Sequence, residues 1–332
     1  MDICARLDER GWLLADGATG TNYFAEGLGA GDPPELWNVD HPDRVRRLHR
    51  AFIEAGADIV LSNSFGGNCH RLKLHRAQDR VGELNALAAR HARAEADAAG
   101  RPVFVAGSMG PTGELLAPVG PLAHGDAVAA FSEQAAALAE GGADLIWIET
   151  ISSQEEAKAA VEGAATTGLP VVLTMSFDTN GRTMMGVTPK GFADFARTLD
   201  PEPFAIGANC GTGAAELVAV VLGISEAAPD AVVVAKSNCG VPEFRGGDIT
   251  YTGTPELMAD YARLVRDAGA RIIGGCCGTT PAHLAAMRAA LEGHEPGPRP
   301  SIDEVVARLG AVSPLARGEP TAASDRPRRR RN

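Results

Sequence analysis

The chain has 332 residues and a formal net charge of −11 at pH 7, and 45% of its residues are hydrophobic. This length fits one large α/β domain or two smaller domains, and it can bury a full core without disulfide bonds. The acidic balance argues against nucleic acid or an anionic membrane as a partner. No apolar stretch reaches the roughly 20 residues of a membrane span, and the N-terminus lacks a signal-peptide pattern. We therefore expect a cytoplasmic protein.

Eight short runs rich in valine and isoleucine predict buried β-strands. In chain order they are residues 12–15, 58–61, 102–106, 144–148, 170–175, 204–208, 231–235 and 271–273. Amphipathic segments between them predict helices, among them 42–55 and 126–141, and Thr254 and Thr280 each precede a proline as helix caps. Eight strand–helix units favour a single-domain (β/α)8 TIM barrel. A doubly wound open sheet is the rival, but the first run is not followed by its Gly-x-Gly-x-x-Gly turn.

A weak internal repeat supports this order of elements. Ala-Gly-Ala-Asp at 55–58, Gly-Gly-Ala-Asp at 141–144 and Ala-Gly-Ala-Arg at 268–271 each join the end of a predicted helix to the start of a strand. The glycine in each is a typical helix C-cap. We expect the barrel to occupy residues 1–295 and a short C-terminal segment to follow at 296–314. The tail at 315–332 contains six arginines against two acids and no apolar periodicity, which predicts disorder.

The six cysteines suggest a metal site. Cys210 follows the sixth strand and Cys276 and Cys277 follow the eighth. In a barrel these strands are separated by one neighbour, and active sites lie at the carboxyl ends of the strands, so the three sulfurs can converge. Three thiolates suit Zn²⁺ and leave a fourth position open. Other cysteines are interpreted as small buried residues (Cys4 and Cys69) or left undecided (Cys239).

Two carboxylates follow strands at the same end. Asp16 comes after the first strand and Glu149 after the fourth. Either could bind the ammonium group of a ligand or serve in acid–base chemistry.

Taken together, these motifs resemble the homocysteine S-methyltransferase family. The matching stretches run in order from about residue 10 to 292: Asp-Gly-Ala-Thr-Gly-Thr at 16–21, Asn-Ser-Phe-Gly at 63–66, Gly-Pro-Thr-Gly at 110–113, Glu-Thr at 149–150, Gly-Ala-Asn-Cys at 207–210 and Gly-Gly-Cys-Cys-Gly-Thr-Thr at 274–280. The resemblance implies a barrel with catalytic zinc held by Cys210, Cys276 and Cys277. It also implies a homocysteine site formed by Asp16, Gly17, Ala18, Asn63, Phe65, Glu149 and Asn209.

Within that family the chain is most similar to the compact bacterial betaine–homocysteine S-methyltransferases. Pro-Glu-Leu-Trp-Asn at 34–38 and Asn-Cys-Gly-Val-Pro-Glu-Phe-Arg at 238–245 carry this closer likeness. It implies methyl transfer from glycine betaine to homocysteine, with small molecules, and neither nucleic acid nor membrane, as partners. The long C-terminal extension that vertebrate betaine enzymes use in assembly is missing, so formation of a homo-oligomer is left open.

Three alternatives remain at this stage. The donor could be a sulfonium compound, S-methylmethionine or S-adenosylmethionine, or the barrel could bind zinc or thiols without catalysis. A lyase with a Schiff-base lysine would depend on Lys236. A quaternary ammonium donor needs an aromatic or acidic lining. The candidates are Tyr23, Phe24, Trp37, Phe65 and Trp147, although Trp147 also fits core packing.

Overall fold

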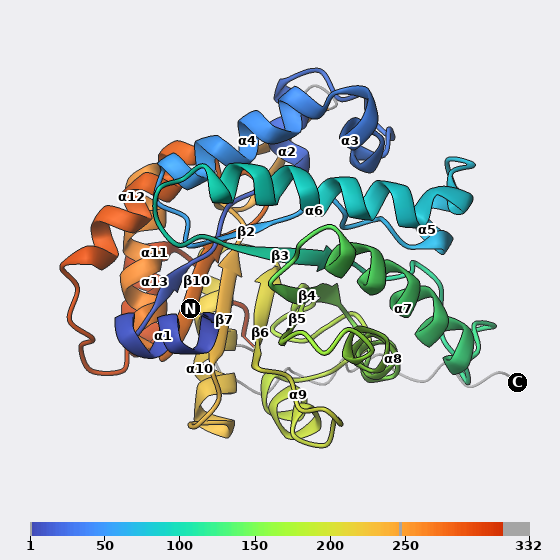
Figure 1. Ribbon diagram of the computed structural model, residues 1–332. Coiled ribbons are helices and arrows are strands. Elements are labelled where there is room, and N and C mark those ends of the chain that lie inside the picture. The colour runs from blue at the N-terminus through green and yellow to red at the C-terminus, as the bar shows by residue number, and fades with distance from the viewer. Residues whose placement is uncertain (1, 246–247, 315–332) are drawn as a thin grey trace, which may run out of the picture.

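Parallel strands form the central sheet of this computed structural model, which describes residues 2–245 and 248–314 (Figure 1). The eight strands are β1 (Leu13–Leu14), β2 (Ile59–Leu61), β3 (Phe104–Met109), β4 (Leu145–Ile151), β5 (Val171–Met175), β6 (Ala205–Cys210), β7 (Val233–Ser237) and β10 (Ala270–Gly275). Their spatial order is β1-β10-β7-β6-β5-β4-β3-β2. A bridge between Ala15 and Ile59 joins the two ends of the sheet. The predicted (β/α)8 barrel is confirmed, and each predicted apolar run overlaps one strand.

Helices follow the strands and surround the barrel (Figure 1). The helix after each successive strand is α4 (Pro42–Glu54), α6 (Val81–Asp97), α7 (His124–Glu140), α8 (Gln154–Ala165), α9 (Pro189–Ala196), α10 (Ala214–Ala227), α11 (Pro255–Asp267) and α12 (Pro281–Glu292). Smaller elements are α1 (Ile3–Arg10), α2 (Gly20–Ala25), α3 (Trp37–Asp40), α5 (Cys69–Lys73), α13 (Ile302–Leu309) and the 3₁₀ turns Pro34–Leu36 and Gln78–Arg80. A hairpin of β8 (Pro242–Arg245) and β9 (Asp248–Tyr251), which the sequence did not predict, lies between β7 and α11.

The internal repeat has a clear structural role. Gly56, Gly142 and Gly269 have φ values of 107°, 97° and 105°, the left-handed conformation that ends a helix. In two of the repeats the following aspartate accepts a backbone N–H of the preceding strand: Asp58 from Leu14 at 3.0 Å and Asp144 from Val105 at 2.7 Å. An arginine neutralises each carboxylate. In these two repeats the glycine ends the helix, and the aspartate two residues later joins the new strand to the preceding one.

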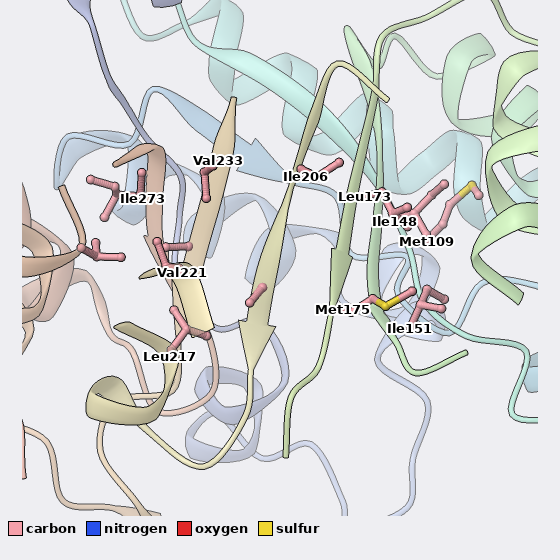
Figure 2. Packing of buried hydrophobic residues seen from close by; sticks show 14 of the residues in the cluster. Met109, Ile148, Ile151, Leu173, Met175, Ile206, Leu217, Val221, Val233 and Ile273 are labelled. Atoms are coloured by element: carbon pink, nitrogen blue, oxygen red, sulfur yellow. The ribbon is translucent and has the colours of Figure 1, made fainter. Parts of the chain in front are cut away.

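Alternation along the strands separates two apolar layers. One set of side chains points outward and packs against the helices, as Figure 2 shows for Ile148, Leu173 and Ile206 on the strands and for Leu217 and Val221 on α10. The other set fills the barrel interior around Trp147, and Ile3 and Leu7 of α1 pack against it. Helix α1 therefore covers the amino-terminal end of the barrel.

Polar residues replace the interior apolar side chains near the carboxyl ends of the strands. Two positions after the inward-facing Ala106, Trp147, Val172 and Val234 come Ser108, Glu149, Thr174 and Lys236. Because side chains alternate with a period of two, these polar groups also face the interior. All four are buried. The interior therefore changes from apolar to polar toward the end of the barrel where a (β/α)8 fold carries its active site.

The structure describes the C-terminal segment as far as residue 314. Val305 of α13 is buried against the barrel helices, and Arg308 pairs with Asp260 of α11. The predicted disordered tail at 315–332 lies outside the described residues. Within the part of the chain that the structure describes, no helix is both long enough and apolar enough to span a membrane.

Removing the Asp58 carboxylate should weaken the closure of the barrel. Its side chain is 3% exposed and binds Leu14 N and Arg288 Nη1, so Asp58→Ala leaves two donors without their acceptor. We expect the free energy of unfolding, measured in urea, to fall by about 3 kcal/mol. Asp194→Ala removes an exposed pair with Lys190 and should cost less than about 1 kcal/mol. Equal losses in the two variants would contradict this role of Asp58.

Candidate metal centre and substrate cavity

A cavity of about 460 Å³ opens at the carboxyl ends of the strands. Its wall includes residues that follow β1, β2 and β10 and residues at the carboxyl ends of β4, β6 and β7. Strands β6, β7 and β10 are neighbours, and their register places Cys210 opposite Ser237 and Ser237 opposite Gly275. The turns that carry the cysteines therefore begin at the same level of the barrel.

The three predicted cysteines come together in this wall. Cys210, Cys276 and Cys277 have sulfur atoms that all lie within 4.8 Å of one another, and Cys210 Sγ is 2.9 Å from Cys276 Sγ. They are the one group of three or more metal-ligating side chains found among the described residues. Three soft sulfur ligands on a cavity wall match a zinc site that keeps one position for a substrate.

Two asparagines hold the turns around these cysteines. Asn238 donates to Gly211 O at 2.7 Å and accepts from Cys277 N at 3.0 Å, so it links the turn after β6 to the turn after β10. Asn209 accepts from Thr150 N at 2.8 Å and donates to Thr150 Oγ1 at 2.7 Å. Thr150 and Cys210 have φ values of 65° and 57°, a conformation that is costly for residues with a side chain. The surrounding hydrogen bonds stabilise this strained backbone at the cavity.

The environment of the thiols favours a thiolate. Hydrogen bonds from Cys210 and Cys276, and a further one from the Tyr251 hydroxyl, lower the pKa of Cys277 to about 3. The same hydrogen bonding to neighbouring sulfur raises the pKa of Cys210. Hydrogen bonding within the cluster therefore favours a thiolate at Cys277, which suits a cation-binding site.

A buried ion pair lies below the cysteines. Lys236 Nζ is 2.7 Å from Asp16 Oδ1, and the two side chains are 2% and 3% exposed. The second oxygen, Asp16 Oδ2, accepts Leu61 N at 2.8 Å. Burial alone would lower the pKa of Lys236, but the charges of Asp16 and Glu149 outweigh burial and raise it. Lys236 is therefore a cation at neutral pH and not the neutral amine that a Schiff-base mechanism needs.

Glu149 is the second carboxylate in the cavity. Its Oε1 accepts a 2.5 Å hydrogen bond from Ser108 Oγ, and Oε2 has no hydrogen-bond partner among the described residues. Burial raises the pKa of Glu149 from 4.5 to about 7, although the Lys236 charge opposes this. A ligand ammonium group would restore the ionised form of Glu149.

The outer part of the cavity combines aromatic and charged groups. Phe24 and Phe65 are 53% and 38% exposed, and both line the cavity. The buried Glu35 accepts Gly66 N at 2.6 Å through Oε1, while its Oε2 has no partner within the described part of the chain. Arg71 also lines this part. The arrangement offers surfaces for a methylated cation and for an anionic group.

The predicted substrate residues divide into lining and supporting positions. Those that line the cavity are Gly17, Ala18, Asn63, Phe65 and Glu149. Asn63 uses its amide to donate to Pro34 O and Asn38 Oδ1. Asn209 is fully buried and holds Thr150, which lines the cavity, through two hydrogen bonds. Its assignment to the substrate site stays a prediction.

Burial also separates the aromatic candidates for a donor site. Tyr23, Trp37 and Trp147 are 0%, 7% and 0% exposed and do not line the cavity, which leaves Phe24 and Phe65 of the five aromatic candidates. Trp147 fills the barrel interior below Lys236. Cys239 is buried with its thiol 3.4 Å from Gly253 O.

Sequence reasoning missed Lys236 as the partner of Asp16, and it missed Asn238, Tyr251 and Glu35. A signal existed for Lys236, because it lies two positions after the inward-facing Val234. Tyr251 belongs to the unpredicted hairpin, and no local pattern indicates its approach to Cys277.

Comparisons with known proteins agree on one family. The profile described as "Homocysteine S-methyltransferase" matches residues 13–291. The chain is 32% identical over 321 residues to a methionine synthase of Mycobacterium tuberculosis and 31% identical over 337 residues to that of Mycobacterium leprae. These matches cover 92% and 97% of this chain but 27% and 28% of the relatives, so the chain spans about a quarter of their length.

Solved structures of homocysteine methyltransferases are also similar to this chain. The oxidized and metallated forms of the homocysteine methyltransferase MmuM from Escherichia coli each match with a TM-score of 0.71, at 26% and 25% identity. Each match covers 86% of this chain and 98% of the MmuM chain.

The raised pKa of Glu149 should make stability depend on pH. Between its usual pKa of 4.5 and about 7 the folded protein binds a proton that the unfolded chain releases, so stability falls as pH rises through this window. The full effect is about 3 kcal/mol. The free energy of unfolding of Glu149→Gln, measured in urea relative to wild type, should therefore rise by about 3 kcal/mol between pH 4 and pH 8. A difference between the two proteins that stays constant with pH would contradict the burial of this charge.

Proposed function

Because the chain belongs to the homocysteine S-methyltransferase family, we propose that it transfers a methyl group from glycine betaine to homocysteine and forms methionine. The observation that carries the proposal is the cluster of three cysteine sulfurs in a cavity that also holds Glu149. Glu149 Oε2 suits the substrate ammonium group, and the cysteine wall suits a metal that takes a sulfur substrate.

Zn²⁺ is the cofactor that the donor set fits, and Cys210, Cys276 and Cys277 would hold it. Bound there, zinc would supply Lewis acidity that keeps the homocysteine sulfur as a thiolate at neutral pH. Asn238 positions two of the three cysteine turns through its hydrogen bonds to Gly211 and Cys277. This chain's own contribution is to orient the sulfur and to exclude water.

The reaction is a direct displacement. The homocysteine thiolate attacks a methyl carbon of the donor, a sulfur–carbon bond forms and the nitrogen–carbon bond breaks. The donor nitrogen keeps the electron pair, so dimethylglycine leaves as a neutral amine that can take a proton. No acid or base is needed at the carbon, which agrees with the role of Glu149 as a binding group.

Betaine as the donor is supported by the outer part of the cavity. A quaternary ammonium group is attracted to aromatic faces and to carboxylates, which Phe65, Phe24 and Glu35 provide. The carboxylate of betaine has a matching cation in Arg71, which lines the same part of the cavity. A donor with both charges therefore fits this part of the cavity.

A donor panel tests the proposal. Zinc-loaded protein is incubated with homocysteine and either betaine, S-methylmethionine or S-adenosylmethionine, and methionine is measured. We expect methionine with betaine. Methionine with the sulfonium donors alone would contradict betaine as the donor, and no methionine from any of them would contradict methyl transfer.

Two cysteine variants serve as matched controls for the panel. Cys276→Ala removes a ligand and should lower both zinc content and activity by more than the 10- to 100-fold typical of a lost supporting residue. Cys239→Ala changes a buried cysteine outside the cavity. This variant should retain its zinc and roughly half or more of the wild-type activity. Unchanged zinc content in Cys276→Ala would contradict the three-cysteine site.

A further inference from the structure

The segment between β7 and α11 holds one of the three clustered cysteines at several points. Asn238 accepts Cys277 N at 3.0 Å, and Cys239 N donates to Cys277 O at 2.8 Å. Further along the same segment, the hydroxyl of Tyr251 on β9 donates to Cys277 Sγ. The backbone and the side chain of Cys277 are therefore both fixed by a segment outside the turn that carries this cysteine.

The local backbone brings the tyrosine ring to the cysteine turn. Gly278 has a φ of 81°, and a Cβ at this position would collide with Tyr251 Cβ and Cγ, so only glycine admits the ring here. Gly253 N donates to Cys239 O at 3.1 Å, and His283 Nε2 on α12 donates to Gly253 O at 3.1 Å. These contacts close the base of the segment and keep Tyr251 beside the turn.

The three cysteines differ in what surrounds their sulfur atoms. Cys210 and Cys276 exchange hydrogen bonds with the other sulfurs of the cluster. Cys277 in addition accepts an O–H donor from outside the cluster. Cys277 lines the cavity and Tyr251 does not. The hydroxyl and a substrate therefore approach this sulfur from different sides.

Negative charge limits which ligands such a cluster can accept. Three thiolates already outweigh the charge of one divalent cation, and a substrate thiolate adds to the excess. The charge of Lys236 offsets part of it near Cys276. A hydrogen bond to a thiolate also takes up part of its charge and fixes its orientation, as supporting groups around metal ligands do. The Tyr251 hydroxyl provides this support at Cys277.

We infer that Tyr251 is a positioning residue for the metal centre, which holds the Cys277 thiolate through its hydroxyl and allows the cluster to accept the homocysteine thiolate as a further ligand. This inference rests on the proposed function, because it takes Zn²⁺ as the metal and a thiol as the substrate. It gives a role to the β8–β9 hairpin, whose second strand ends at Tyr251.

Tyr251→Phe tests the hydroxyl alone, since the ring that packs on Gly278 remains. Zinc affinity is measured by competition with a chelator. Homocysteine is then titrated into Co²⁺-loaded protein without a methyl donor, and the sulfur-to-cobalt charge-transfer bands are recorded. We expect zinc affinity to fall about 10- to 100-fold, the range for a lost supporting group at a metal site. Homocysteine affinity should fall with it, and the bands should move to lower energy because a thiolate without this hydrogen bond is a stronger electron donor.

Tyr23→Phe is the matched control. The Tyr23 hydroxyl is buried without a hydrogen-bond partner among the described residues, and the side chain does not line the cavity. This variant should leave the zinc affinity, the homocysteine affinity and the bands unchanged. Bands and homocysteine affinity in Tyr251→Phe that equal those of the wild type would overturn the inference. Equal losses in the two variants would also overturn it, because they would indicate a general effect of lost hydroxyl groups on packing.

The inference and the proposed function can fail separately, since neither measurement includes a methyl donor. Weaker zinc and homocysteine binding with shifted bands in Tyr251→Phe, but no methionine from any donor with the wild type, contradicts only the proposed function. Methionine formation by the wild type, with metal and thiol binding that do not depend on the Tyr251 hydroxyl, contradicts only the inference.

Discussion

The parallel pairing of β6, β7 and β10 is the constraint on which the site depends. In-register hydrogen bonding places Cys210, Ser237 and Gly275 at one level, so the next turn of β10 brings Cys276 and Cys277 toward Cys210. A shift of one residue in either ladder would turn these side chains to the opposite face. The three-sulfur cluster is therefore a consequence of strand register, and Asn238 reinforces it between the two turns.

The interior of the barrel has a matching order along its axis. Apolar side chains around Trp147 fill the lower interior, and a layer that contains Lys236, Glu149 and Ser108 lies above them. Low exposure strengthens the charges of this layer and makes an unpaired charge expensive. The Asp16–Lys236 pair offsets part of that cost, and Glu149 Oε2 remains open to a ligand ammonium group.

Local sequence patterns predicted the scaffold better than the site. The eight apolar runs, the helix-ending glycines and the cysteine pair after the last run follow from short-range rules, and the structure agrees with them. The hairpin β8–β9 was missed because its two four-residue strands carry no run of valine and isoleucine like those of the barrel strands. The supporting contact of Asn209 with Thr150 could not be predicted, because Thr150 comes from another strand. The alternation along β7 indicates that Lys236 faces the interior, but neither segment alone identifies Asp16 as its partner.

The central claim is that the three cysteines bind a metal that takes the substrate sulfur. X-ray absorption at the zinc edge of the zinc-loaded protein tests it most directly. We predict three sulfur ligands without homocysteine and four sulfur ligands after it is added. A coordination shell without three sulfurs, or one that homocysteine leaves unchanged, would contradict the account.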